Sequence, residues 1–145
     1  MAPEMNDSIR NNANPGVDIF ASGVFLFTLL CGTPPFRRAS KSDPLFSLLM
    51  NKKYDKFWDI HISNIESKLS FLSEDKLSVQ LSFEIQDLIC KMLAFNPKER
   101  PSITEIKKHP FYMKEVASAE EVIVEMQKRK IKLNKAQVLY RTKKD

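Results

Sequence analysis

The sequence has few glycines and cysteines, and it has no strand-like alternation of apolar and polar residues. Its three glycines, Gly16, Gly23 and Gly32, lie too far apart to form a Gly-x-Gly-x-x-Gly phosphate-binding loop. Its two cysteines, Cys31 and Cys90, fall within apolar helical patterns and lack the spacing of metal ligands. We therefore expect buried free thiols in a reducing compartment. With neither alternation nor repeats, the pattern predicts an all-α protein.

The sequence also lacks a leader segment and a long membrane span. No basic and apolar leader begins it, so we expect an intracellular protein, in the cytoplasm or the nucleus. The longest uncharged run, residues 19–36, reaches the length of a short membrane span. However, Thr33 and the two prolines that follow it end the helical part of this run. This favours a buried core helix.

Charge is unevenly distributed along the 145 residues, 28% of which are charged. Residues 1–113 carry 14 basic and 13 acidic side chains, a net of +1, whereas residues 114–145 carry 9 and 5, a net of +4. Residues 128–144 contain eight basic side chains, no acidic ones, and interleaved apolar residues. A nearly neutral body is expected to end in a basic extension, which either is solvated or binds calmodulin, acidic lipid or nucleic acid.

The most apolar helix is predicted at residues 19–31. It is apolar on every face, which indicates a helix buried all round. Asp18 precedes it as a predicted N-cap, and Gly32 follows it as a predicted C-cap.

Several shorter helices have recognisable start signals. Asp43 and the proline after it predict a helix from Leu45 to Met50, and the apolar period returns from Phe83 to about residue 93. Capping boxes begin at Ser102 and at Ser118, and the second opens a helix to about Lys130. We expect residues 5–16 to form a loop, and residues 51–81 to be irregular apart from a short helix.

Three aromatic residues cluster in the segment predicted to be irregular. Tyr54, Phe57 and Trp58 would serve as a docking surface for a partner or, in the simpler interpretation, pack together in a loop-rich region.

Arg100 lies between two prolines, directly after an apolar helical stretch. A buried arginine needs a carboxylate, and its planar guanidinium group can bind one through two parallel hydrogen bonds. Glu4, near the start of the chain, is the candidate partner.

Five motifs, in this order along the chain, resemble those of the C-terminal half of a eukaryotic protein kinase domain. They are Ala2-Pro3-Glu4, Asp18-Ile19-Phe20-Ala21-Ser22-Gly23-Val24, Gly32-Thr33-Pro34-Pro35-Phe36, Asn96-Pro97-Lys98-Glu99-Arg100-Pro101 and His109-Pro110-Phe111. The resemblance covers residues 1–112 and is greatest to serine/threonine kinases of the calmodulin-dependent and related groups. It implies a partial kinase domain, the C-terminal helical subdomain with a central buried helix, followed by a basic helical extension at residues 113–145.

The resemblance also implies roles for single residues. Glu4 would close the activation segment and pair with Arg100, and Asp18 would match the aspartate that holds the catalytic loop. Gly23 belongs to the same helical motif as Asp18. Two positions depart from the family pattern, since Phe20 stands where tryptophan is usual and Ala21 where serine is usual.

The motifs that carry phosphoryl transfer are not found in this sequence. Neither histidine is followed by Arg-Asp, and no glycine follows Asp-Phe. We therefore expect no catalytic, ATP-binding or metal-binding residue here; ATP and Mg²⁺ would belong to a complete kinase acting on protein substrates. The chain would then be a poorly stable kinase C-lobe, from a truncated gene model or a short product. The alternative is a non-catalytic, kinase-derived interaction module that binds substrates or regulators.

Overall fold

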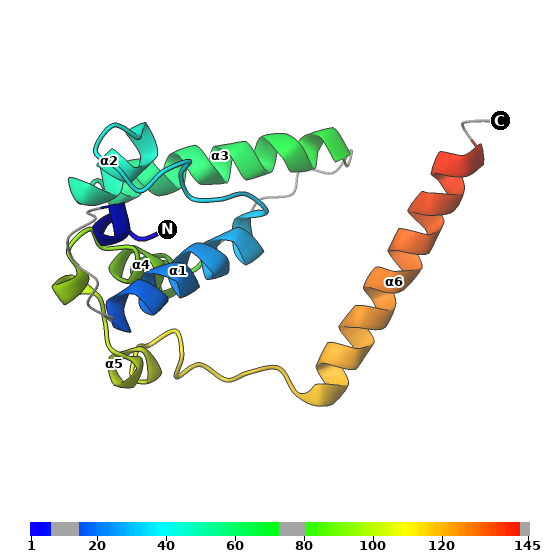
Figure 1. Ribbon diagram of the computed structural model, residues 1–145. Helices are drawn as coiled ribbons and strands as arrows, with labels where there is room; N and C mark the ends of the chain where they lie inside the picture. The colour runs from blue at the N-terminus through cyan, green and yellow to red at the C-terminus, as the bar shows by residue number, and fades with distance from the viewer. Residues whose placement is uncertain (7–14, 73–80, 143–145) are drawn as a thin grey trace. The chain divides into compact units, whose positions relative to one another are not determined.

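Every regular element in the described part of the chain is a helix, which confirms the predicted all-α fold class (Figure 1). The computed structural model describes residues 1–6, 15–72 and 81–142, without the side chains of residues 68–72, 132 and 135–142. In chain order the elements are η1 (Pro3–Asn6), α1 (Pro15–Cys31), α2 (Pro44–Met50), α3 (Tyr54–Leu72), α4 (Phe83–Met92), η2 (Pro97–Glu99), α5 (Ile103–Lys107) and α6 (Ala119–Thr142).

The chain divides into two compact units. The first unit, Met1–Met113, contains all the elements except α6, and the second unit, Lys114–Asp145, contains α6. None of the helices in the described ranges is both long and apolar enough to span a bilayer.

Helix α1 is central to the first unit, because it packs against α3, α4 and η2. Gly23 lies at a tight contact with the end of α4. A Cβ atom added there would lie 2.9 Å from the Met92 Cβ and 3.1 Å from the Leu93 Cδ2. Cβ atoms do not approach so closely, so a larger residue at this position would push the two helices apart.

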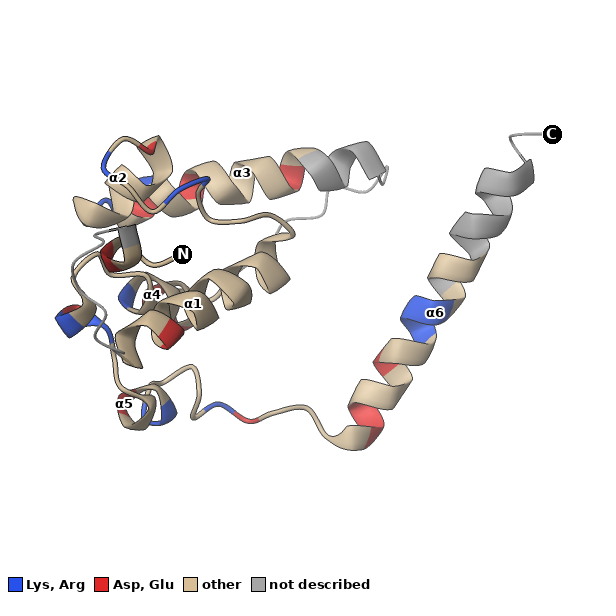
Figure 2. Cartoon of the chain, viewed as in Figure 1, with Lys and Arg blue, Asp and Glu red and all other residues tan. Residues whose placement is uncertain are grey.

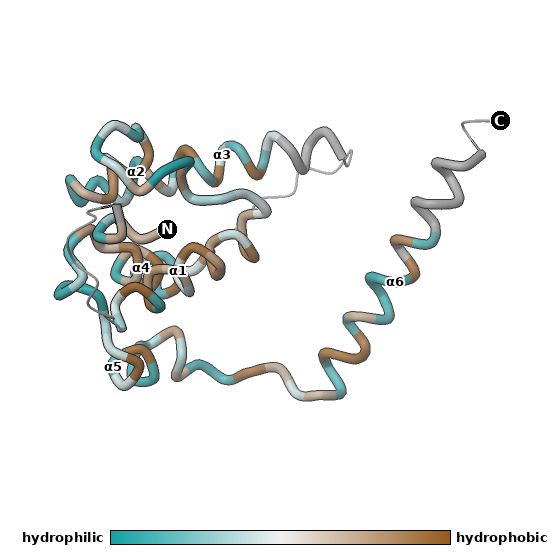
Figure 3. Tube along the Cα trace, in the orientation of Figure 1, coloured by the Kyte–Doolittle hydropathy of each residue, from teal (hydrophilic) through white to brown (hydrophobic). Residues whose placement is uncertain are grey.

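Only part of α1 is buried, although apolar residues recur along its whole length (Figure 3). Phe20 and Phe27 are 1% and 0% exposed, whereas Phe25 and Leu29 are each 66% exposed. The prediction of a helix buried all round is therefore wrong for this structure. The neighbouring elements of the first unit cover one side of α1 and leave the other open.

The ends of α1 differ in how well they were predicted. The predicted cap at Gly32 is confirmed, because Gly32 has a φ of +67° and donates its N–H to the Thr28 carbonyl at 2.9 Å. Asp18 is not the N-cap, because the helix already begins at Pro15 and places Asp18 in its first turn. Most of the loop predicted at residues 5–16 lies outside the described residues.

The segment predicted to be irregular instead contains α3, a helix of 19 residues. Its inward side chains follow the helical period, with Phe57, Trp58 and His61 buried and Ile62 and Ile65 half-buried. The sequence prediction missed this period because the segment contains only short apolar stretches separated by serines and other polar residues. Residues 73–80, at the end of that segment, lie outside the described range.

The other predicted helix starts are present. Asp43 caps α2 by accepting the N–H groups of Leu45 and Phe46, each at 3.0 Å. The capping boxes at Ser102 and Ser118 both form. Helix α6 is longer than predicted, since it continues to Thr142.

The core of the first unit contains an aromatic cluster formed by Phe27, Phe57, Trp58 and His61. The ring of His61 lies 4.6 Å from the rings of both Phe27 and Phe57, measured between centroids. The Nε2 of His61 is 3.0 Å from the Pro35 carbonyl, and it must donate there because a carbonyl only accepts. His61 is therefore held in the core with a hydrogen on its Nε2.

Both cysteines are free and buried, as predicted. Trp58 donates its indole N–H to the Cys90 Sγ at 3.3 Å. Burial raises the pKa of both the Cys31 and the Cys90 thiols to about 11, so both stay protonated and unreactive near neutral pH.

We expect the free energy of unfolding to fall as the pH falls below about 6.5, because of His61. Burial lowers the pKa of His61 below its ordinary value of 6.5, and the Pro35 hydrogen bond offsets this only in part. The unfolded chain then binds a proton that the folded chain does not. The loss approaches about 1.4 kcal/mol per pH unit within that window.

Urea titrations followed by the fluorescence of Trp58, the single tryptophan, test this expectation at pH 7.5, 6.5 and 5.5. His61→Gln should flatten the slope of stability against pH, whatever its effect on stability itself. The control is Asn64→Gln, an exposed and non-titrating position on the same helix, and it should keep the slope. A flat profile in the unmodified chain would contradict the assignment.

Candidate functional site

The segment between α4 and α5 turns the Arg100 side chain into the body of the first unit. Asn96 caps η2 by accepting the Lys98 N–H at 3.1 Å, with Pro97 at the first helical position. Arg100 ends η2 with an extended backbone, at φ −76° and ψ 139°. Its side chain is 0% exposed, which is unusual for an arginine.

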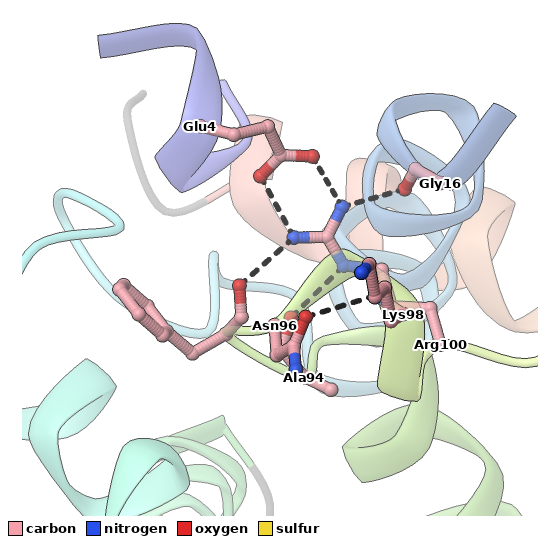
Figure 4. Close-up of polar contacts among 7 residues, drawn as sticks. Glu4, Gly16, Ala94, Asn96, Lys98 and Arg100 are labelled. Atoms are coloured by element: carbon pink, nitrogen blue, oxygen red, sulfur yellow. Dashed lines mark hydrogen bonds and ion pairs between the residues drawn. The ribbon is translucent and has the colours of Figure 1, made fainter. Parts of the chain in front are cut away.

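Arg100 and Glu4, 96 positions apart in the sequence, form a bidentate ion pair (Figure 4). The Nη1 of Arg100 donates to the Oε1 of Glu4 at 2.6 Å, and its Nη2 donates to Oε2 at 2.9 Å. The two groups thus meet in the parallel geometry that a guanidinium group and a carboxylate favour.

The remaining N–H groups of Arg100 bind backbone carbonyls, as Figure 4 shows. Nη1 also donates to Gly16 at 2.7 Å, Nε donates to Ala94 at 2.9 Å, and Nη2 donates to Phe95 at 3.4 Å. All five donors of the guanidinium group are therefore used. Arg100 joins η1, the start of α1 and the segment after α4, and it has no donor left for a substrate.

Phe20 completes the surroundings of Arg100. The guanidinium carbon lies 4.7 Å from the centroid of the Phe20 ring, within the range of a cation–π contact. Phenylalanine therefore supplies the aromatic face at this position, although it lacks the N–H donor of tryptophan.

The ion pair also changes the ionisation of Glu4. Burial raises the pKa of this carboxyl. The hydrogen bonds and charge of Arg100, together with a backbone hydrogen bond, lower it by more, so the pKa of Glu4 lies below its ordinary value. Glu4 therefore stays ionised in the folded chain at neutral pH. Its contribution to stability is present above its unfolded pKa and is lost as the pH falls through its lower, folded value.

The structure does not gather the three predicted docking aromatics on one surface. Phe57 and Trp58 are 0% and 3% exposed and belong to the core, whereas Tyr54 is 37% exposed. The prediction that all three form a docking surface is therefore corrected for Phe57 and Trp58. Both side chains pack in the core, because α3 turns them toward α1. The predicted basic segment, residues 128–144, lies mostly outside the described side chains.

Two carboxylates with several partners were missed as sites by the sequence reading. Asp43 was predicted only as a helix cap, yet its Oδ2 also accepts the N–H groups of Arg37 and Arg38, each at 3.1 Å. Burial raises the pKa of Asp43, but its four backbone hydrogen bonds outweigh this and lower it. No local signal marks the two additional bonds, because they depend on how the loop folds back.

Asp87 is the second carboxylate that was missed. It accepts from Lys91 at 2.6 Å, one turn along α4, and lies 3.0 Å from the Nε2 of His109, beyond the end of α5. His109 belongs to a motif noted in the sequence, but its partner lies 22 positions earlier. Burial raises the pKa of Asp87, whereas Lys91 and His109 lower it by more.

Within the described residues, no group of three or more His, Cys, Asp or Glu side chains is arranged to hold a metal ion. We therefore assign no metal ligand to the described part of the chain. The Glu4–Arg100 pair is a structural connection rather than a reactive centre, since every guanidinium donor is already bonded.

Replacing Arg100 with methionine should lower the free energy of unfolding by about 3 kcal/mol, because it leaves the Glu4 carboxylate without its charged partner. Arg100→Lys should recover only part of the lost stability, since an ammonium group cannot form the two parallel hydrogen bonds that a guanidinium group makes with a carboxylate. The measurement is urea unfolding followed by Trp58 fluorescence.

The control is Lys91→Met, which removes an exposed ion pair from the same unit and should cost less than about 0.5 kcal/mol. A loss for Arg100→Met no larger than that for Lys91→Met would show that the Glu4 pair does not stabilise the fold.

Comparison with known proteins shows which family this sequence resembles. The family model described as "Protein kinase domain" matches residues 1–112. The human SNF-related serine/threonine-protein kinase is 36% identical over 97 residues, which are 67% of this chain and 10% of that protein.

Two calcium-dependent kinases are also similar. Calcium-dependent protein kinase 5 of Plasmodium falciparum is 30% identical over 114 residues, or 79% of this chain and 16% of that protein. Calcium-dependent protein kinase 34 of Arabidopsis thaliana is 31% identical over 122 residues, or 84% of this chain and 19% of that protein.

The chain thus spans between 10% and 19% of the length of these relatives. The match covers the whole first unit apart from its last residue, including both partners of the buried ion pair. The chain therefore belongs to the protein kinase domain family and carries part of that domain.

Proposed function

We propose that this chain is the C-terminal helical portion of a serine/threonine protein kinase, and that the complete protein transfers phosphate from ATP to protein substrates. The Glu4–Arg100 ion pair is the main observation that supports this proposal. In the kinase resemblance, this glutamate closes the activation segment, and the structure holds it against Arg100 at 2.6 and 2.9 Å. The relatives named as serine/threonine and calcium-dependent kinases support the same activity class.

Catalysis is proposed only for the complete kinase. The sequence of this chain contains no Gly-x-Gly-x-x-Gly, His-Arg-Asp or Asp-Phe-Gly motif, and phosphoryl transfer in this family depends on those groups. We therefore propose that the chain alone is inactive and that ATP and Mg²⁺ would be held by residues outside it. The role of this portion is to hold the end of the activation segment in place through the Glu4–Arg100 ion pair.

We propose the cytoplasm as its location. The two unpaired, buried thiols, Cys31 and Cys90, support a reducing compartment.

A phosphorylation assay tests the proposal. The 145-residue chain, given radiolabelled ATP, Mg²⁺ and a mixture of serine and threonine peptides, should transfer no phosphate above background. A product extended upstream in the same reading frame should encode Asp-Phe-Gly and His-Arg-Asp and should phosphorylate those peptides.

Two outcomes would overturn this proposal. Phosphate transfer by the 145-residue chain itself would contradict its inactivity. A stop codon directly upstream, with no kinase motif before it, would contradict the kinase role of this product and leave the kinase-derived interaction module as its function.

The second candidate function is partner binding by α6. Val122, Met126 and Leu133 recur on one face of this helix and are 48–62% exposed, near the basic run that begins at Lys128. Ile131 adds exposed apolar surface on the opposite face. We propose an acidic, calmodulin-type protein as the partner, because an apolar groove rimmed by carboxylates complements such a helix.

Fluorescence anisotropy of the labelled 145-residue chain, titrated with calmodulin in Ca²⁺ and in a chelator, tests this second function. We expect Ca²⁺-dependent binding that weakens with salt, and Met126→Asp should weaken it at least tenfold. Glu115→Gln, outside α6, is the control. Binding unaffected by Met126→Asp, or none at micromolar calmodulin, would favour a solvated helix.

A further inference from the structure

The segment between α1 and α2 contains three basic residues that lie close to one serine in the sequence, and Figure 2 shows basic residues along this segment. Arg37 and Arg38 stand three and two positions before Ser40, and Lys41 follows it. All three basic side chains are exposed, and Ser40 is half-buried. No other serine or threonine of the 145 residues has arginine at both of these positions.

The fold holds the backbone of this segment while leaving its charges in solvent. Asp43 accepts the backbone N–H groups of Arg37 and Arg38, so neither guanidinium group is needed to hold the loop. Within the described residues, neither arginine side chain makes a hydrogen bond or an ion pair. Phe36, Ala39 and Asp43 are buried and anchor the loop on the body of the first unit.

Ser40 lies at the start of a tight turn. Its carbonyl accepts the Asp43 N–H at 3.1 Å, and its own N–H donates to the Arg38 carbonyl at 2.9 Å. The Ser40 hydroxyl lies 2.9 Å from the Ser42 hydroxyl in an exposed setting. Presenting Ser40 to another enzyme therefore requires only the opening of a short surface turn, and no helix has to unfold.

Paired arginines before a serine suit an enzyme that selects basic substrates. Each guanidinium group can bind a carboxylate of the enzyme bidentately, and in an extended chain the first arginine lies about 10 Å from the serine. Charge patterns of this kind determine which substrates a kinase accepts.

We propose that Ser40 is a phosphorylation site, modified by a separate serine kinase that selects basic substrates. The Ser40 Oγ attacks the γ-phosphorus of ATP and forms a P–O bond. The bond from that phosphorus to the β,γ-bridging oxygen breaks, and ADP leaves with the electron pair. The hydroxyl proton passes to a carboxylate of the acting kinase. This site does not depend on the function proposed above, because the chain is here the substrate.

The experiment uses the folded 145-residue chain with ATP, Mg²⁺ and the catalytic subunit of cyclic-AMP-dependent protein kinase as a probe enzyme for paired arginines. We expect a mass gain of one HPO₃ group, located at Ser40 by fragmentation. Ser40→Ala should abolish it, and Ser42→Ala should retain it. The double variant Arg37→Ala, Arg38→Ala should lower kcat/KM more than tenfold.

The arginine variant has a control in the same loop, Lys41→Ala, which should stay within threefold of the unmodified chain. Circular dichroism should show that all variants keep their helical content, since these positions lie in the turn between α1 and α2 rather than in a helix. Equal labelling of Ser40→Ala and the unmodified chain would overturn the proposal. Labelling that appears only after unfolding in urea, followed by dilution into the assay, would also overturn it.

Discussion

The buried guanidinium group of Arg100 is the interaction on which the first unit depends most. Its five N–H donors bind the Glu4 carboxylate on η1, one backbone carbonyl on α1 and two backbone carbonyls after α4. The Phe20 ring covers one face of the guanidinium group. A buried charge with a missing partner is costly, so losing the partner of Arg100 would destabilise the contact between these segments. Such a pair need not add much net stability compared with an apolar core, but it allows one arrangement of the three segments.

Helix α1 supplies the second constraint, because the rest of the first unit is organised against it. Gly23 lets α4 approach until no Cβ would fit between them, and Phe27 contacts the aromatic cluster on α3. The opposite side of the helix exposes Phe25 and Leu29. The kinase family relationship and this open apolar side both fit a chain that forms one part of a larger domain.

Some of the structure could be predicted because its signals are local. The caps at Gly32, Asp43, Ser102 and Ser118 involve residues within four positions of one another, and each is present. Helix α3 was missed because its sequence contains only short apolar stretches separated by serines and other polar residues. The bonds from Asp43 to Arg37 and Arg38, and from Asp87 to His109, could not be predicted, because they require loops to fold back on helices.

By itself, the sequence determined the helical class, most helix starts, the kinase family resemblance and the pairing of Glu4 with Arg100. These depend on short-range backbone geometry or on motifs that carry their own chemistry. Only the tertiary structure decided which apolar residues are buried: Phe57 and Trp58 lie in the core, whereas Phe25 and Leu29 face solvent. All four are large apolar or aromatic residues, so hydropathy alone does not separate the buried pair from the exposed pair. Burial differs because it depends on which elements pack against a given face, and that is a property of the whole fold.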